Sequence, residues 1–287
     1  MENQAVFENE WEVERLHIQN KLLWECEQPV FDKVFKGRSG ARVLDIGCNN
    51  GCKTMERFDR PEVSRVMGLE YNEALARWAH GRHGGEVFSF HPCDLESPSF
   101  ARELSALMEQ AGIEAFDVIY ASFVLMHLRD PQTVLKTLRP FLAPGGCLLI
   151  EEADDLACSL TPDRQGLFRQ FLQMLALDPY AGNRRCGEQV VGWLERCGYR
   201  RIQQLPAAIR ATGGQLKKKE DIFEVFCSYF PQDIKLLQKV EQKNRVWFEC
   251  ECWLERNYDA LRENATSMKS EFVFALQFIL CRECDKV

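Results

Sequence analysis

The feature that most constrains the fold is an apolar run that leads into a glycine turn, Val43-Leu44-Asp45-Ile46-Gly47-Cys48-Asn49-Asn50-Gly51. The apolar residues before the turn suit a strand that is covered on both faces of a parallel sheet. Glycines at positions 47 and 51 remove side chains where a ligand could approach the backbone. We therefore expect a buried strand, a ligand-binding turn and a helix that begins at Cys52.

The turn does not match the sequence patterns of two other glycine-rich ligand-binding loops. A dinucleotide fingerprint needs G-x-G-x-x-G, and its second and third glycines would fall at Asn49 and Cys52. A phosphate-binding loop ends in G-K-[ST], which Gly51-Cys52-Lys53-Thr54 misses by one residue. A strand–turn–helix corner without a ligand stays an alternative interpretation of the loop alone.

The chain on both sides of residue 100 alternates between apolar strands and amphipathic helices, as a doubly wound sheet requires. One of these helices, at residues 72–81, is expected to turn Leu75 and Trp78 inward, and another begins at Asp130-Pro131. The predicted fold class is α/β, with a doubly wound, seven-stranded, mostly parallel sheet. After the first strand, the predicted strands lie at residues 63–69, 86–90, 116–122, 147–150, 199–205 and 272–280.

With these strands in place, the motif Asp45-x-Gly47-Cys48-x-x-Gly51 resembles the first motif of the class I S-adenosylmethionine (SAM) dependent methyltransferases. Further matching segments follow in the family's order: Asp94-Leu95 after the third strand, residues 121–128 after the fourth, and L-x-P-G-G before the fifth. The resemblance implies a Rossmann-like fold, SAM as cofactor and S-adenosyl-L-homocysteine as product. The family usually has glycine where Asn49 stands, and asparagine tolerates the left-handed backbone that such a turn needs.

Glu70 follows the second strand about 20 residues beyond the glycine turn, where a carboxylate can accept two hydrogen bonds from a ribose diol. The resemblance implies that Asp94 takes the adenine amino group and that the backbone N–H of Leu95 meets a ring nitrogen. Asp94 could instead cap a helix that starts near Pro98. The full predicted cofactor set is Arg15, Asp45, Gly47, Cys48, Gly51, Glu70, Tyr71, Asp94, Leu95, Ser122 and Phe123.

The first forty residues predict two helices, the second beginning at Pro29. The first resembles an N-terminal helix that lies over the cofactor pocket in some small-molecule methyltransferases. The resemblance implies that Arg15 meets the carboxylate of SAM, whereas without it Arg15 would be an exposed surface residue.

Three titratable residues follow the fourth and fifth strands. His127 is a candidate general base because imidazole titrates near neutral pH, but the favoured interpretation is that it packs beneath the sheet and hydrogen-bonds the backbone. Glu151 and Glu152 stand at the carboxyl end of the fifth strand, where ligands bind in open α/β sheets. They could orient a cationic or hydroxylated substrate, or belong to a solvated loop.

Four segments make up the predicted domain organisation: a helical cap at residues 1–40, the SAM-binding core at 41–210, a helical insertion at 211–268 and the final strand at 269–287. Within the insertion, Val240, Trp247, Leu254 and Leu261 recur every seven residues, which indicates one long helix. We expect the insertion to serve as a cap with an apolar pocket, or as a dimer element.

Composition limits the function classes. The formal net charge of -7 does not favour an extended nucleic-acid surface, and no run of about 18 apolar residues predicts a membrane span. The acidic start lacks a signal pattern, so we expect a cytoplasmic protein whose 13 cysteines are reduced. We expect no metal site, because Cys250 and Cys252 would point about 200° apart on a helix and so would not join Cys281 and Cys284.

The sequence therefore predicts a SAM-dependent methyltransferase that acts on an O, N or C nucleophile of a small molecule. The alternatives are a methyltransferase acting on tRNA or protein, and a SAM-binding protein without catalytic activity.

Overall fold

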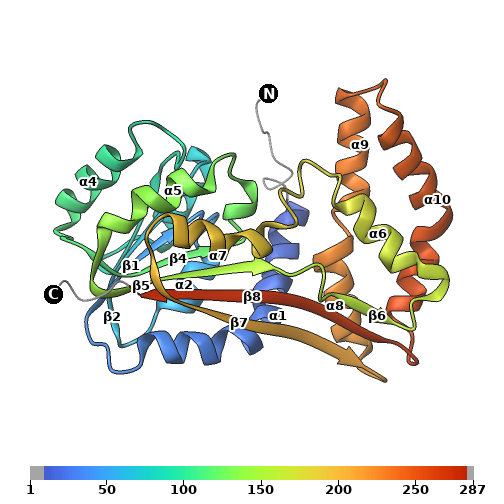
Figure 1. Ribbon diagram of the computed structural model, residues 1–287, viewed down its shortest axis with the longest axis horizontal. Helices are drawn as coiled ribbons and strands as arrows, with labels where there is room; N and C mark the ends of the chain where they lie inside the picture. The colour runs from blue at the N-terminus through green and yellow to red at the C-terminus, as the bar shows by residue number, and fades with distance from the viewer. Residues whose placement is uncertain (1–9, 283–287) are drawn as a thin grey trace. The chain divides into compact units, whose positions relative to one another are not determined.

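The computed structural model describes residues 10–282, which form an α/β protein with eight strands in one sheet (Figure 1). The chain divides into two compact units. Of the described residues, unit 1 contains 10–28, 154–184 and 207–276, and unit 2 contains 29–153, 185–206 and 277–282. Helix α1 (Glu10–Phe35) and strands β7 (Arg200–Thr212) and β8 (Glu271–Arg282) contribute residues to both units. The predicted boundaries at residues 40, 210 and 268 stay predictions.

Unit 2 holds the parallel part of the sheet, with strand order β3-β2-β1-β4-β5, and β8 follows β5. Every pairing among β1 to β5 is parallel, which confirms the doubly wound sheet. The chain order reverses between β1 and β4, and open α/β sheets bind ligands at the carboxyl ends of the strands beside such a reversal. The bounds are β1 (Ala41–Ile46), β2 (Val63–Glu70), β3 (Phe88–Pro92), β4 (Phe116–Ser122) and β5 (Leu142–Ala153).

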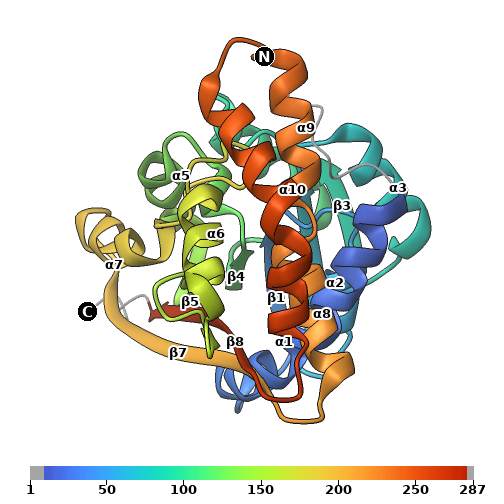
Figure 2. The ribbon, with the colours of Figure 1, turned by 90° about the vertical axis from the view of Figure 1, so that its right-hand side faces the viewer.

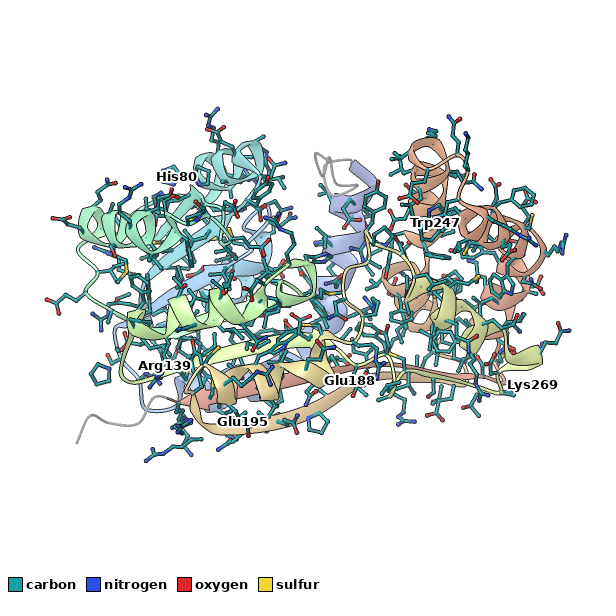
Figure 3. All side chains as sticks on the ribbon, turned by 45° about the horizontal axis from the view of Figure 1, so that its top comes forward. His80, Arg139, Glu188, Glu195, Trp247 and Lys269 are labelled. Atoms are coloured by element: carbon teal, nitrogen blue, oxygen red, sulfur yellow. The ribbon has the colours of Figure 1, made fainter. Side chains whose placement is uncertain are left out.

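Helices connect these strands and bury their apolar faces against the sheet. Helix α5 begins at the predicted Asp130-Pro131, where the Asp130 side chain accepts the Thr133 N–H. Glu188 and Glu195 lie on the exposed face of α7 (Figure 3). The helices of unit 2 are α2 (Cys52–Phe58), α3 (Glu73–His83), α4 (Phe100–Ala111), α5 (Pro131–Leu138) and α7 (Cys186–Arg196), with short 3-10 turns η2 (Leu125–His127) and η3 (Arg139–Phe141).

The prediction that Trp78 faces the interior from α3 was wrong. It is 51% exposed, while the buried positions of α3 are Ala76 and Ala79. Small residues suit these positions because Ala79 lies against the glycine turn, where the Cβ of Ala79 would be only 3.2 Å from a Cβ placed on Gly51. A bulky indole has no room there and turns to solvent.

Unit 1 is mostly helical, and its longest helix, α10, packs against α6, α8 and α9 (Figure 2). Trp247 is buried at the start of α10, and its indole N–H donates to Glu241 at 2.8 Å (Figure 3). The elements are β6 (Ser159–Thr161), η4 (Arg164–Gly166), α6 (Leu167–Leu175), α8 (Leu216–Cys227), α9 (Phe230–Val240) and α10 (Arg245–Ala265). Strand β6 pairs antiparallel with β8.

Two helix predictions were wrong. The chain does not start a new helix at Pro29, because α1 continues through it to Phe35 and the residues after the proline, including Phe31, are fully buried. The seven-residue repeat is not one helix, since Val240 ends α9 and is 61% exposed. A new helix starts after Asn244, whose side chain accepts the N–H of Val246 and caps α10.

Within residues 10–282, no helix combines the length and apolar character that a membrane span requires.

Candidate functional site

The turn after β1 has the backbone that its sequence predicts. Gly47, Asn49 and Gly51 all have positive φ angles, of 69°, 50° and 72°. Asn49 therefore adopts the left-handed conformation in place of glycine, and its Oδ1 accepts the N–H of Asn50 at 2.7 Å. The turn therefore has the left-handed backbone at three positions, one of them without glycine.

The glycines also make room for protein side chains. A Cβ on Gly47 would lie 2.4 Å from Cγ2 of Val124, and one on Gly51 would lie 2.8 Å from Cε1 of Phe90. Both residues are thus required by close packing as well as by backbone conformation. The sequence argument, which considered only approach by a ligand, missed this packing.

Glu70 links the turn to the end of β2. Its Oε2 accepts the backbone N–H of Asn49 and its Oε1 that of Asn72, each at 2.9 Å. Burial raises the pKa of Glu70, although the backbone donors oppose this. The backbone N–H of Tyr71 is a third donor to this carboxylate, and a carboxylate has about four acceptor positions, so one position remains for a further donor such as a ribose hydroxyl. The next residue, Tyr71, is 71% exposed.

The glycine turn and the end of β1 carry two buried titratable side chains, Asp45 and Cys48. Asp45 is buried and accepts the hydroxyl hydrogen of Thr54 at 2.6 Å. Burial raises the pKa of Asp45 to about 7, although Thr54 and Lys53 act to lower it. The backbone N–H of Cys48 donates to Leu69, and burial raises the pKa of its thiol. The Asp45 carboxyl group therefore titrates near neutral pH, and the Cys48 thiol stays protonated there.

Asp94 and Leu95 follow β3 in unit 2, as predicted. The Oδ1 of Asp94 accepts the N–H of Glu96 at 2.9 Å, which makes a local turn. Helix α4 begins only at Phe100, so the alternative in which Asp94 caps that helix is wrong. Leu95 is buried and packs in the core around β1 and β4.

Ser122 and Phe123 form a strained corner at the end of β4. Phe123 has a positive φ of 53°, which is uncommon for an aromatic residue, and its N–H donates to the backbone oxygen of Glu151 at 2.8 Å. Strained backbone of this kind concentrates at functional sites, where the surrounding contacts hold it.

A buried ion pair that was not predicted supports this corner. Lys53, in the first turn of α2, donates to Oε2 of Glu151 at 2.8 Å and to Oγ of Ser122 at 2.7 Å. Ser122 and the Tyr120 hydroxyl donate to the same Glu151 oxygen at 2.8 and 2.7 Å. Lys53 also lies 5.6 Å from the centre of the Phe123 ring. The sequence near Lys53 carries no signal for this ion pair.

Glu151 and Glu152 are fully buried, so the solvated-loop alternative for both is wrong. Burial by itself would raise the pKa of Glu151, but Lys53 and the donated hydrogen bonds hold that pKa below its ordinary value. Its Oε1 has no hydrogen-bond partner among the described residues. Glu152 accepts the N–H of Leu125 at 2.9 Å and so fixes the start of η2.

The structure also describes His127 and Arg15. His127 is exposed in η2, so the alternative in which it packs beneath the sheet is wrong. Arg15 lies in unit 1 and is not an exposed surface residue, because it is 8% exposed and pairs with Glu12 at 2.6 Å. Its contact with the carboxylate of SAM stays a prediction. The other ten predicted cofactor residues all lie in unit 2, at or after the carboxyl ends of β1 to β4.

Across residues 10–282, no three His, Cys, Asp or Glu side chains are grouped as a metal site would require. Cys284, one of the four cysteines considered for zinc, lies outside the described residues.

Comparison with curated proteins finds relatives of two substrate classes. The chain is 32% identical over 144 residues to a ubiquinone biosynthesis O-methyltransferase from Caulobacter sp. (strain K31), which covers 47% of this chain and 52% of that protein. It is 29% identical over 208 residues to a tRNA U34 carboxymethyltransferase from Klebsiella pneumoniae (strain 342), which covers 68% of this chain and 54% of that protein. The chain thus spans about half the length of the curated relatives it matches.

A solved structure shares the fold. Phosphoethanolamine N-methyltransferase 2 from Haemonchus contortus, in complex with S-adenosyl-L-methionine, matches 98% of this chain and 59% of its own with a TM-score of 0.51 at 13% identity. The sequence model of the family described as a methyltransferase domain matches residues 25–248. Because this match covers well over half of the 287 residues, the chain belongs to the SAM-dependent methyltransferases with a Rossmann-like fold.

Proposed function

We propose that this methyltransferase binds SAM at the carboxyl ends of β1, β2 and β3 and methylates a small molecule. The observation that carries the proposal is the position of Glu70, which two backbone N–H groups hold beside the glycine turn. The residues present fit the cofactor: an acid with an acceptor position for a ribose hydroxyl, a turn with three positive φ angles and a second acid, Asp94, after β3.

When bound, SAM supplies an electrophilic methyl group on a positively charged sulfur. Glu70 would fix the ribose, and Asp94 with the N–H of Leu95 would hold the adenine. Lys53 and Glu151 keep the corner at Ser122 and Phe123 rigid, and by resemblance the methionine part of SAM passes this corner. The protein would thus work mainly by alignment of the two reactants and exclusion of water. His127 and Glu151 stay the candidates for a proton acceptor, should the acceptor molecule arrive protonated.

A small-molecule acceptor is favoured by the net charge of -7 and by the ubiquinone O-methyltransferase relative. A second candidate acceptor is tRNA, the acceptor given in the name of the Klebsiella carboxymethyltransferase, whose match covers 68% of this chain. Incubation with methyl-labelled SAM and either a metabolite extract or total tRNA separates the two. Label in a low-molecular-weight product that chromatography separates from SAM supports the first, and label in RNA overturns it.

Substitution Glu70→Ala should weaken SAM binding by about 100-fold, because two hydrogen bonds to a charged group are lost at roughly 1.5 kcal/mol each. The measurement is calorimetric titration with SAM and with S-adenosyl-L-homocysteine. The matched control is Glu73→Ala, a surface carboxylate whose side chain is 60% exposed. Equal affinity in the Glu70 variant and the wild type would contradict the assignment.

SAM binding should depend on pH through Asp45, whose pKa burial raises to about 7. The positive charges of SAM favour the ionised carboxylate, so below pH 7 binding must first remove a proton. The affinity should therefore fall as pH decreases from 7.5 to 5.5, by at most about tenfold per unit, and stay level above pH 7.5. Asp45→Asn should flatten this profile. A profile that is unchanged in the variant would show that Asp45 does not couple to the cofactor.

Substitution Lys53→Met should lower the free energy of unfolding by about 3–5 kcal/mol, because it leaves the Glu151 carboxylate buried without its cation. The double variant Lys53→Met/Glu151→Gln should recover most of the loss, since Gln keeps an acceptor for Tyr120 and Ser122. Urea denaturation measures both. The control is Lys136→Met on the exposed side of α5, expected within about 0.5 kcal/mol of the wild type. A double variant no more stable than Lys53→Met would contradict the pairing.

A further inference from the structure

The loop after β3 makes a contact with the start of α5 that is not one of the predicted cofactor contacts. Glu96, two residues after Asp94, accepts the backbone N–H of Asp130 at its Oε1 over a distance of 2.8 Å. Its Oε2 accepts the Nε–H of Arg129 at 3.1 Å. Glu96 and Asp130 are 34 residues apart in the chain, and both belong to unit 2. Glu96 therefore ties the loop after β3 to the segment that follows β4 and η2.

The contact completes the cap of α5. Asp130 is the N-cap residue: its Oδ1 accepts the N–H of Thr133 at 3.1 Å, and its Oδ2 accepts the Thr133 hydroxyl hydrogen at 2.6 Å. In a capping box, the third residue of the helix is Glu or Gln, whose side chain reaches back to the N–H of the N-cap residue. Thr133 occupies that position in α5, and Glu96 accepts the N–H in its place. The start of α5 thus depends on a residue from the loop after β3.

The bond to the Asp130 N–H contributes more to this tie than the ion pair does. The Arg129 side chain is 86% exposed, so solvent screens its attraction to the carboxylate. The Glu96 side chain is only 16% exposed, and a hydrogen bond from a backbone N–H to a carboxylate is stronger than one between neutral groups. Loss of Glu96 should therefore have a larger effect than loss of Arg129.

A second carboxylate holds the other end of the segment that leads to Asp130. Glu152 accepts the N–H of Leu125 at 2.9 Å, where η2 begins. His127, the candidate proton acceptor, lies in η2 between the two attachment points. The segment is thus held at both ends by carboxylates from other elements. Of the two, only Glu96 belongs to the loop that is predicted to hold adenine.

Glu96 is itself held by the residue that is predicted to meet adenine. The backbone N–H of Glu96 donates to Oδ1 of Asp94 at 2.9 Å, and that of Ser97 donates to the Asp94 backbone oxygen at 3.1 Å. This turn occupies Oδ1 and leaves Oδ2 without a hydrogen bond from residues 10–282. Leu95, inside the turn, is buried in the same core cluster as Leu125. A ligand that fixes Asp94 therefore also fixes the Glu96 carboxylate.

We propose that Glu96 is a positioning residue that couples adenine binding at Asp94 to the placement of His127. A cofactor bound at Asp94 holds the turn that carries Glu96, and Glu96 holds the N–H of Asp130 at the end of the His127 segment. The coupling is reciprocal, so a fixed start of α5 also favours the bound cofactor. The acceptor molecule then meets a fixed His127 only after the cofactor has bound. This role rests on the methyltransferase function proposed above.

Hydrogen–deuterium exchange of the full chain, with and without S-adenosyl-L-homocysteine, tests the coupling. In the wild type, the ligand should slow exchange in residues 47–51 and, by about tenfold or more, in residues 124–130. In Glu96→Ala, the ligand should still slow exchange in residues 47–51, but the slowing in residues 124–130 should fall below about threefold. Equal slowing of residues 124–130 in this variant and in the wild type overturns the coupling.

Further variants distinguish the two contacts of Glu96. Glu96→Gln keeps an acceptor for the Asp130 N–H and should restore most of the slowing that Glu96→Ala loses. Arg129→Met removes only the exposed ion pair and should behave as the wild type does. Glu109→Ala, at an exposed position of α4, is the matched control and should also leave the slowing unchanged. An Arg129→Met variant that loses the slowing, or a Glu96→Gln variant that does not restore it, overturns the role given to the Asp130 hydrogen bond.

The same exchange data separate failure of the coupling from failure of the proposed function. If the ligand slows exchange nowhere in the wild type, the proposed cofactor site fails and the coupling fails with it. Slowing that is confined to residues 47–51 in the wild type keeps the cofactor site and overturns the coupling alone.

Discussion

The contact on which the cofactor site depends is the pair of backbone hydrogen bonds that Glu70 accepts from Asn49 and Asn72. One carboxylate thereby ties the turn after β1 to the end of β2. The turn needs such a tie because Asn49 holds a left-handed backbone that non-glycine residues rarely adopt. The glycines on either side have no space for a Cβ, since Val124 and Phe90 lie within 3 Å of where it would be. The shape of the loop is therefore set by its contacts with the end of β2 and with two packed side chains.

A second set of contacts holds the backbone in place at the end of β4. Lys53 reaches from α2 to Ser122 and Glu151, and Tyr120 completes the arrangement. The ion pair with Lys53 keeps Glu151 ionised although Glu151 is fully buried, because the lysine and the hydrogen bonds outweigh the cost of burial. The strained backbone of Phe123 lies directly beside it. Two rigid corners, one after β1 and one after β4, thus stand where the strand order reverses.

The sequence predicted the features that depend on local pattern. The strand before Gly47, the acid at position 70 and the capped start of α5 at Asp130 each follow from a few neighbouring residues, and each is present. The sequence pattern did not predict contacts between residues that are far apart in the chain. Nothing near Lys53 indicates that it pairs with Glu151, 98 residues later, and nothing near Arg15 indicates that Glu12 and the backbone of Val225 hold it buried.

The wrong helix predictions have the same origin. A proline at position 29 is a local signal for a helix start, but the fully buried Phe31 keeps the helix continuous through packing. The seven-residue repeat through Val240 and Trp247 crosses a break that Asn244 caps, so its regular spacing did not reflect one element. The burial of Glu151 and Glu152 is likewise a tertiary effect, since two adjacent acids in a sequence look like a solvated loop.

The most direct test of this account is a crystal structure of the protein with S-adenosyl-L-homocysteine. We predict the ribose hydroxyls within hydrogen-bond distance of the Glu70 carboxylate, with the bonds from Asn49 and Asn72 retained. The adenine should lie beside Asp94 and Leu95. A nucleoside bound away from Glu70, or a turn in which Asn49 has left the left-handed conformation, would contradict the account.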